Sequence, residues 1–401
     1  MQMQPPHRRA TLTLWAAVAL VAVTARADEP RLPGIDAAMQ GLIAAGEIAG
    51  AVTVVVKPDG IVHLEPHGFA DLATQHPMAT DTVFWIASMT KPVTGVAVAM
   101  LIDDGLLDID DPVDRYVPEF KDLKTPAGRP ARITIRQILT HTSGLGEAAP
   151  EAARKARSLA ELVPAWLAAP MKNEPGEKWA YTQSGINLAA RIVEVVSRRP
   201  FDAFLRERVF EPLGMSDTTF FPPEPQRSRL ATPYARQRGS GRLERVPHRL
   251  DFAAPPPPPL GNGGLYSTAR DYAAFCRMLL NSGAVEGRRL LGAEGMRALT
   301  TVHTGELPTG FLQGETFGSR GGNYGWGLGI CVLKQPHDGV AAMLSPGTFG
   351  HGGAWGTQAW IDPVKQVAYV LMVQRTNFTN SDGSDVRRVF QEAAAAAIPQ
   401  R

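Results

Sequence analysis

The sequence has few cysteines, no excess of either charge and, beyond its first residues, no long apolar run. Cys276 and Cys331 are its only cysteines, too few for a metal framework, and it contains neither a His-Glu-x-x-His motif nor a carboxylate-rich loop. The two thiols can pair in an oxidising compartment or remain buried and free, and the sequence leaves both open. We therefore expect chemistry that needs no metal and no cofactor.

The first 27 residues and the balanced charge indicate where the protein is located and which partners it lacks. His7, Arg8 and Arg9 precede an apolar run over residues 12–23, and Ala25-Arg26-Ala27 fits a small-x-small cleavage site. This pattern predicts a secretory signal peptide over residues 1–27, with an uncleaved anchor as the alternative. Cleavage removes three arginines and changes the formal charge from +2 to −1. We expect an exported protein, periplasmic or secreted, without affinity for nucleic acid and without membrane insertion after cleavage.

The nucleophile signature Gly-x-Ser-x-Gly is also missing, which excludes the commonest α/β-hydrolase arrangement. Instead, Ser88 and Lys91 stand three residues apart at a predicted helix start, and positions i and i+3 share one helix face. A lysine with a lowered pKa can take the serine proton, and the first turn of a helix offers N–H groups to an oxyanion. The alternative is an N-cap serine followed by an exposed lysine. This pair alone is weak evidence for a catalytic site.

Hydrophobic periodicity predicts the fold class. Residues 51–57 and 61–65 form a predicted hairpin, residues 324–333, 357–361 and 367–373 are three further strands, and residues 385–397 form a closing helix. Between them, predicted helices alternate with proline-rich loops, at residues 134–141, 159–168, 183–197, 201–210 and 268–282. We expect one α+β domain over residues 28–401. Its antiparallel sheet, flanked by helices, is built from residues 28–110 and 290–401, and residues 111–289 form an inserted, mainly helical part.

Two later segments offer partners for Ser88. Tyr181 can carry a proton if cations lower its pKa, and the amide of Gln183 suits a substrate carbonyl; a buried structural tyrosine is the alternative. Around His351, Gly352 and Gly353, glycines allow a ligand to approach a strand edge whose N–H groups face it, and the histidine adds a hydrogen bond. A glycine-rich turn is the alternative there. For His141 and Ser143, at a helix end, a structural role is favoured.

Together these segments resemble the serine β-lactamase and penicillin-binding-protein superfamily, in its class C-like branch, which includes family VIII carboxylesterases. The resemblance covers about residues 35–395 and rests on Ser88-Met-Thr-Lys91, Tyr181-Thr182-Gln183 and the His351-Gly352-Gly353 segment. It implies an antiparallel sheet plus a helical region with the site between them. Ser88 is then the acylated nucleophile, Lys91 and Tyr181 share acid–base work in an order that stays open, and the N–H groups of Ser88 and Ala354 form the oxyanion hole.

Two positions depart from this resemblance. Gln183 stands where β-lactamases of the branch have asparagine, and His351 stands where they carry a lysine that helps to bind the substrate carboxylate. A histidine in place of an obligate cation weakens recognition of an anionic substrate. We therefore predict hydrolysis of a small carboxylic ester through acyl-Ser88. The alternatives are a β-lactamase or D-amino-acid peptidase, with an amide substrate, and a binding protein for β-lactam or peptidoglycan ligands that does not turn over.

Overall fold

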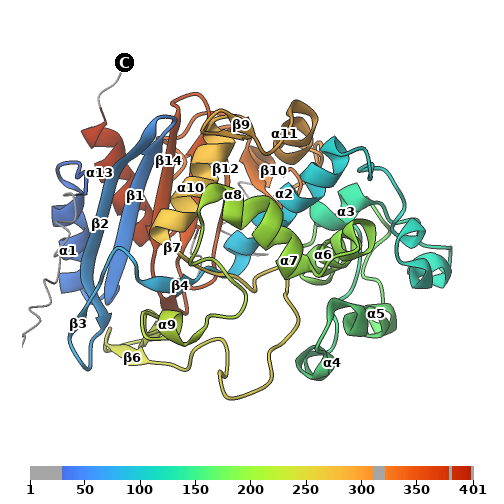
Figure 1. Ribbon diagram of the computed structural model, residues 1–401, viewed down its shortest axis with the longest axis horizontal. Coiled ribbons are helices and arrows are strands. Elements are labelled where there is room, and N and C mark those ends of the chain that lie inside the picture. The colour runs from blue at the N-terminus through green and yellow to red at the C-terminus, as the bar shows by residue number, and fades with distance from the viewer. Residues whose placement is uncertain (1–28, 310–320, 379–381, 399–401) are drawn as a thin grey trace, which may run out of the picture.

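An eight-stranded antiparallel sheet lies at the centre of the computed structural model, which describes residues 29–309, 321–378 and 382–398 (Figure 1). The strand order is β10-β11-β12-β13-β14-β1-β2-β3, so β1 from the start of the chain pairs with β14 from its end. The predicted α+β fold, with a sheet built from both chain ends, is confirmed. The strands are β1 (Gly50–Lys57), β2 (Gly60–Asp71), β3 (His76–Pro77), β10 (Tyr324–Trp326), β11 (Cys331–Leu333), β12 (Phe349–Gly352), β13 (Gln358–Asp362) and β14 (Val367–Met372).

The prediction of one strand over residues 324–333 was wrong. The chain turns back between β10 and β11, where Gly329 has φ 67, a left-handed conformation that favours glycine. A Cβ on Gly329 would also lie 2.7 Å from the carbonyl oxygen of Lys91. This hairpin therefore packs directly against the helix that carries Lys91.

Helices cover both faces of the sheet (Figure 1). On one face lie α1 (Ile35–Ala44) and α13 (Asp385–Ala397), whose apolar side chains share a core with β1 and β14. On the other face α10 (Ala269–Leu280) packs against β1 and β14, although we had placed these residues in the helical part. The remaining helices are α2 (Thr90–Asp103), α3 (Ile135–Leu139), α4 (Pro150–Lys155), α5 (Leu159–Ala168), α6 (Ser184–Ser197), α7 (Phe201–Leu205), α8 (Glu211–Leu213), α9 (Glu224–Arg227) and α11 (Ala293–Thr300).

The middle of the chain also contains short strands that we did not expect: β5 (Tyr234–Arg236), β6 (Leu243–Arg245) and β7 (Tyr266–Thr268). Strand β7 pairs with β4 (Val83–Trp85), just before Ser88. Cys276 and Cys331 are both buried free thiols. No helix in the described ranges is long and apolar enough to cross a membrane. The predicted signal peptide, residues 1–27, lies outside the described residues.

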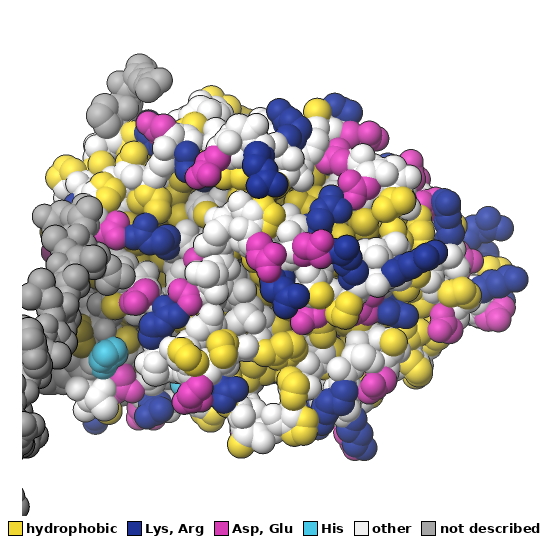
Figure 2. Space-filling model, viewed as in Figure 1, with side chains coloured by type: hydrophobic (Ala, Val, Ile, Leu, Met, Phe, Trp, Pro, Cys, Tyr) yellow, Lys and Arg dark blue, Asp and Glu magenta, His cyan; other side chains and the backbone are white. Residues whose placement is uncertain are grey.

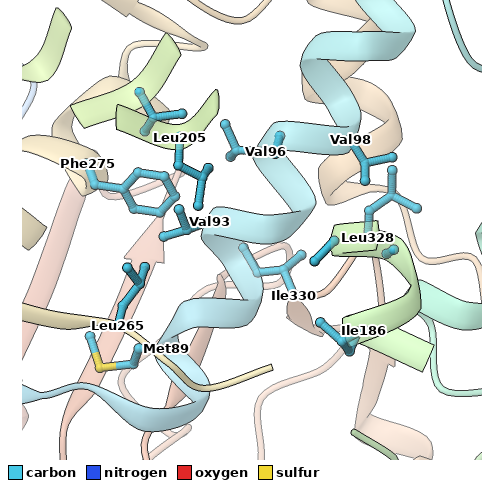
Figure 3. Packing of buried hydrophobic residues seen from close by; sticks show 14 of the residues in the cluster. Met89, Val93, Val96, Val98, Ile186, Leu205, Leu265, Phe275, Leu328 and Ile330 are labelled. Atoms are coloured by element: carbon cyan, nitrogen blue, oxygen red, sulfur yellow. The ribbon is translucent and has the colours of Figure 1, made fainter. Parts of the chain in front are cut away.

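The central helix α2 is apolar around its whole circumference and is therefore enclosed (Figure 3). All residues from Thr90 to Ile102 are buried. Figure 3 shows Val93, Val96 and Val98 among side chains from several other elements, including Phe275, Leu205, Ile330 and Ile186. Because truncating a large buried side chain typically costs about 2–5 kcal/mol, this packing holds the start of α2 firmly in place.

A chain of hydrogen bonds joins α1 to the sheet through two buried histidines of β2. The Leu32 N–H donates to His63 Nδ1 (3.0 Å), so in the neutral ring Nε2 carries the hydrogen and donates to Thr53 Oγ1 (2.8 Å). Thr53 donates to His67 Nε2 (2.8 Å), and His67 Nδ1 donates to the Asp36 carboxylate (3.0 Å). Glu65 lies beside these histidines, in a grouping that resembles a metal site. Because His63 Nε2 must carry a hydrogen, it offers no lone pair to an ion.

Candidate active site

The nucleophile stands on a strained turn between β4 and α2. Ala87, the residue before Ser88, has φ 46, a left-handed conformation that costs a non-glycine residue of order 1–3 kcal/mol. The turn is fixed by Thr90 Oγ1, which donates to the Ala87 carbonyl (2.7 Å), and by the Tyr272 hydroxyl, which donates to the Met89 carbonyl (2.8 Å). Met89 is buried, whereas Ser88 remains partly exposed. The fold therefore presents Ser88 to solvent on a rigid support.

Lys91 is fully buried, and its side-chain nitrogen contacts three oxygen atoms. Nζ lies 3.0 Å from Ser88 Oγ, 3.0 Å from Gln183 Oε1 and 2.7 Å from the Asn262 carbonyl oxygen. The amide and carbonyl oxygens only accept, so they take two N–H bonds of a neutral amine and direct its lone pair at Ser88. Burial lowers the pKa of Lys91 well below its usual range, and the charge of Glu147 opposes this in part. The geometry therefore suits Lys91 as a base toward Ser88.

Tyr181 links Ser88 to His351. Its hydroxyl lies beside the Ser88 side chain and 3.3 Å from His351 Nε2. His351 Nδ1 donates to the Gly352 carbonyl (2.6 Å), so Nε2 of the neutral ring is an acceptor facing Tyr181. Burial, with Lys91 nearby, lowers the pKa of His351 to about 3, so the ring is neutral. Burial also raises the pKa of Tyr181 far above its usual value, which disfavours a tyrosinate.

The end of β12 is held against the nucleophile turn. Thr357 Oγ1 donates to the Ile86 carbonyl (3.2 Å), and Gly353 N–H donates to the Thr357 carbonyl (2.6 Å). A Cβ on Gly353 would lie 2.0 Å from Thr357 Oγ1 and 2.6 Å from the Ile86 oxygen, so only glycine fits. The next residue, Ala354, is exposed. We propose its N–H as the second donor to an oxyanion, beside that of Ser88.

Packing also requires glycine in this segment, while the ligand approach expected from the sequence stays a prediction. A Cβ on Gly352 would lie 1.8 Å from Asp382 Oδ1 and 2.4 Å from Gln358 Nε2. Asp382 thus fills the space beside Gly352, and its charge contributes to the raised pKa of Tyr181. The buried Arg387 donates to the Asp382 carbonyl oxygen (2.7 Å) and stacks over Trp360. Asp382 is a site residue that sequence analysis missed.

Two further residues around Gln183 were missed. The side chain of Asn262 donates to Gln183 Oε1 (2.8 Å), so this oxygen accepts from both Asn262 and Lys91, and only the Nε2 group of Gln183 can donate to a substrate carbonyl. Glu147 accepts hydrogen bonds from the backbone of Gln183 and Ser184 and from the Ser184 hydroxyl (2.8 Å). It satisfies N–H groups at the start of α6 and so fixes Gln183 against Lys91. The adjacent Gly263-Gly264 segment was the sequence feature that could have indicated Asn262 as a site residue.

Aromatic side chains enclose the back of Tyr181. The rings of His141 and Trp326 lie 4.6 Å and 5.9 Å from that of Tyr181. His141 is buried, and its Nδ1 accepts from the Thr182 N–H (3.2 Å). Burial lowers the pKa of His141 well below the usual range, so it is a neutral packing partner. The structure thus places Ser88, Lys91, Tyr181, Gln183 and His351 in one cluster of contacts.

Comparisons with known proteins agree with this architecture. The family profile described as Beta-lactamase matches residues 35–394. Protein Rv1367c of Mycobacterium tuberculosis is 35% identical, over 86% of this chain and 90% of its own. Esterase EstB of Burkholderia gladioli is 29% identical, over 87% of this chain and 91% of its own. The solved structure of EstCE1, a hydrolase with promiscuous acyltransferase activity, has a TM-score of 0.73 and 22% identity, over 90% of this chain and 97% of its own.

Proposed function

Because this chain belongs to the beta-lactamase family, we propose that it is a serine hydrolase that cleaves carboxylic esters through an acyl-Ser88 intermediate. One observation carries the proposal: the buried Lys91 amine lies 3.0 Å from Ser88 Oγ, and its other contacts are two obligate acceptors. That arrangement gives the serine a base whose lone pair faces its proton.

Lys91 is the first base in the proposed mechanism. As Ser88 Oγ attacks the ester carbonyl, its proton moves to Lys91 Nζ, and the N–H groups of Ser88 and Ala354 bind the oxyanion. Tyr181 does not take that proton, because burial keeps its pKa far above the usual value. When the carbon–oxygen bond breaks, Tyr181 donates its proton to the departing oxygen and regains one from the Lys91 ammonium. A water molecule then attacks the acyl-enzyme and releases the acid, with its proton transferred through the same groups.

His351 directs the proposal toward esters rather than β-lactams or peptides. It is buried and neutral, with Nδ1 bonded to Gly352 and Nε2 facing Tyr181. It therefore offers no positive charge to the carboxylate of a β-lactam or of a peptide C-terminus. Hydrolysis of an ester does not require a positive group that binds a carboxylate.

A substrate panel tests the proposal. Purified protein should hydrolyse short-chain p-nitrophenyl esters with a far higher kcat/KM than a chromogenic cephalosporin or a D-alanyl-D-alanine peptide, and Ser88→Ala should abolish the ester activity. Faster turnover of the cephalosporin or the peptide would instead establish the β-lactamase or peptidase alternative. Labelling of Ser88 without turnover of any substrate would establish a binding protein.

We also propose that the protein is exported, on the basis of the pattern in residues 1–27. Expression of the full chain in a bacterium, followed by cell fractionation and N-terminal sequencing, should give a periplasmic or secreted product that begins near Asp28. A cytosolic product that keeps Met1 would contradict export.

A further inference from the structure

Glu147 places an exposed carboxylate beside the catalytic cluster. Its carboxylate bonds to the backbone N–H of Gln183 and of Ser184, and the Gln183 side chain reaches Lys91 in turn. Glu147 is exposed, and among the described residues it forms no ion pair. Its charge acts on Lys91, whose amine lies 3.0 Å from Ser88 Oγ, so a substrate bound at Ser88 lies near this carboxylate.

The positive groups around the catalytic cluster do not cancel this charge for a ligand. Lys91 is buried behind Ser88 and is held by three oxygen atoms. His351 is neutral, and Arg387 is buried beside Asp382 and Trp360. The exposed Arg249 stacks on Trp85, and among the described residues it forms no contact with Gln183 or Glu147. The Gln183 end of the site is consequently negative.

On the face that Figure 2 shows, basic and acidic side chains are interspersed. That face therefore has no large patch of one charge that would attract a charged substrate from a distance. Charge selection is then set by the groups nearest the site. At a separation of roughly 8 Å and an effective dielectric constant of about 40, one unit charge alters the binding of another by about fivefold.

We propose that Glu147 makes this enzyme selective for esters that carry a cationic group, in the order cationic, neutral, anionic. The proposal rests on the ester hydrolysis proposed above and narrows its substrate class. Glu147 acts through charge on the substrate and also positions Gln183, so its test must separate these two roles.

Three p-nitrophenyl esters of similar size provide that test: the trimethylammonio-pentanoate, the hexanoate and the adipate half-ester. At low ionic strength the wild-type kcat/KM should be about fivefold higher for the cationic than for the neutral ester, and about fivefold lower for the anionic one. Glu147→Gln keeps an oxygen acceptor for α6 but removes the charge, so both ratios should approach one. Glu147→Asp should preserve them, and added salt should reduce them in the wild type.

Glu161→Gln is the matched control, because Glu161 accepts from the Arg157 N–H (2.9 Å) and the Ser158 hydroxyl at the start of α5 but touches none of the catalytic residues. It should leave both ratios unchanged. Two results would overturn the charge proposal but not ester hydrolysis. The first is wild-type kcat/KM ratios near one. The second is an equal fall of kcat/KM for all three esters in Glu147→Gln, with the ratios unchanged. If the wild type hydrolysed none of the three esters, the proposed function itself would fail.

Discussion

Removal of the Tyr181 hydroxyl should affect esters according to their leaving group. In Tyr181→Phe the ring keeps its contacts with His141 and Trp326, and the variant loses the hydroxyl that lies beside Ser88 and His351. We expect a loss of stability of about 1 kcal/mol, since a net hydrogen bond contributes roughly 0.5–1.5 kcal/mol. The folded enzyme should therefore be available for kinetics.

The kinetic effect follows from the role of Tyr181 as the proton donor. A p-nitrophenolate ion leaves without a proton, so kcat/KM for a p-nitrophenyl ester should fall by no more than about tenfold, the equivalent of one hydrogen bond. An alkyl ester releases a strongly basic alkoxide, so its kcat/KM should fall by about 10²–10⁴, the usual contribution of a general acid. Stopped-flow release of p-nitrophenol and pH-stat titration of the alkyl ester measure the two values. Equal losses of about 10³ or more on both esters would refute this reasoning and make Tyr181 the first base.

Three other changes test separate parts of the structure. Gly353→Ala places a methyl group 2.0 Å from Thr357 Oγ1. It should therefore displace the Ala354 N–H and lower kcat for ester hydrolysis by about 10²–10³. An unchanged kcat would contradict the oxyanion assignment. Burial lowers the pKa of Lys91, so kcat/KM should rise with pH as Lys91 loses its proton, with a midpoint well below 10.5. A midpoint at the ordinary lysine value would contradict a neutral base. Burial lowers the pKa of His63 from 6.5 to about 4, so the unfolded chain binds more protons between these values. Thermal melts should show about 1–2 kcal/mol of stability lost as pH falls through that range. His63→Asn should remove this loss, while the exposed His76→Asn should not.

The sequence predicted those elements whose patterns are local. Strands β1, β2, β13 and β14 and the helix Asp385–Ala397 follow from periodicity and flanking turn residues, whereas β3 and β12 were not predicted. The proximity of Ser88 and Lys91 follows from helix geometry. The hairpin between β10 and β11 was missed because its residues remain apolar through the turn. Only the left-handed Gly329, packed on Lys91, marks the reversal.

The site residues that were missed act across long separations in the chain. The Asn262 carbonyl that binds Lys91 is a backbone atom 171 residues away, and every residue type carries such a group. Glu147 and Asp382 are ordinary acidic residues in loops, and only the fold brings them to Gln183 and Gly352. Local sequence can therefore indicate the nucleophile, but it cannot show which groups set the protonation of its base.

The most direct test of the central claim is the mass of the protein during turnover. Wild-type protein quenched in acid while it hydrolyses a p-nitrophenyl ester should carry one acyl group, which peptide mapping places on Ser88, and Ser88→Ala should carry none. Turnover without a trapped adduct, or an adduct that persists in Ser88→Ala, would contradict covalent catalysis by this serine.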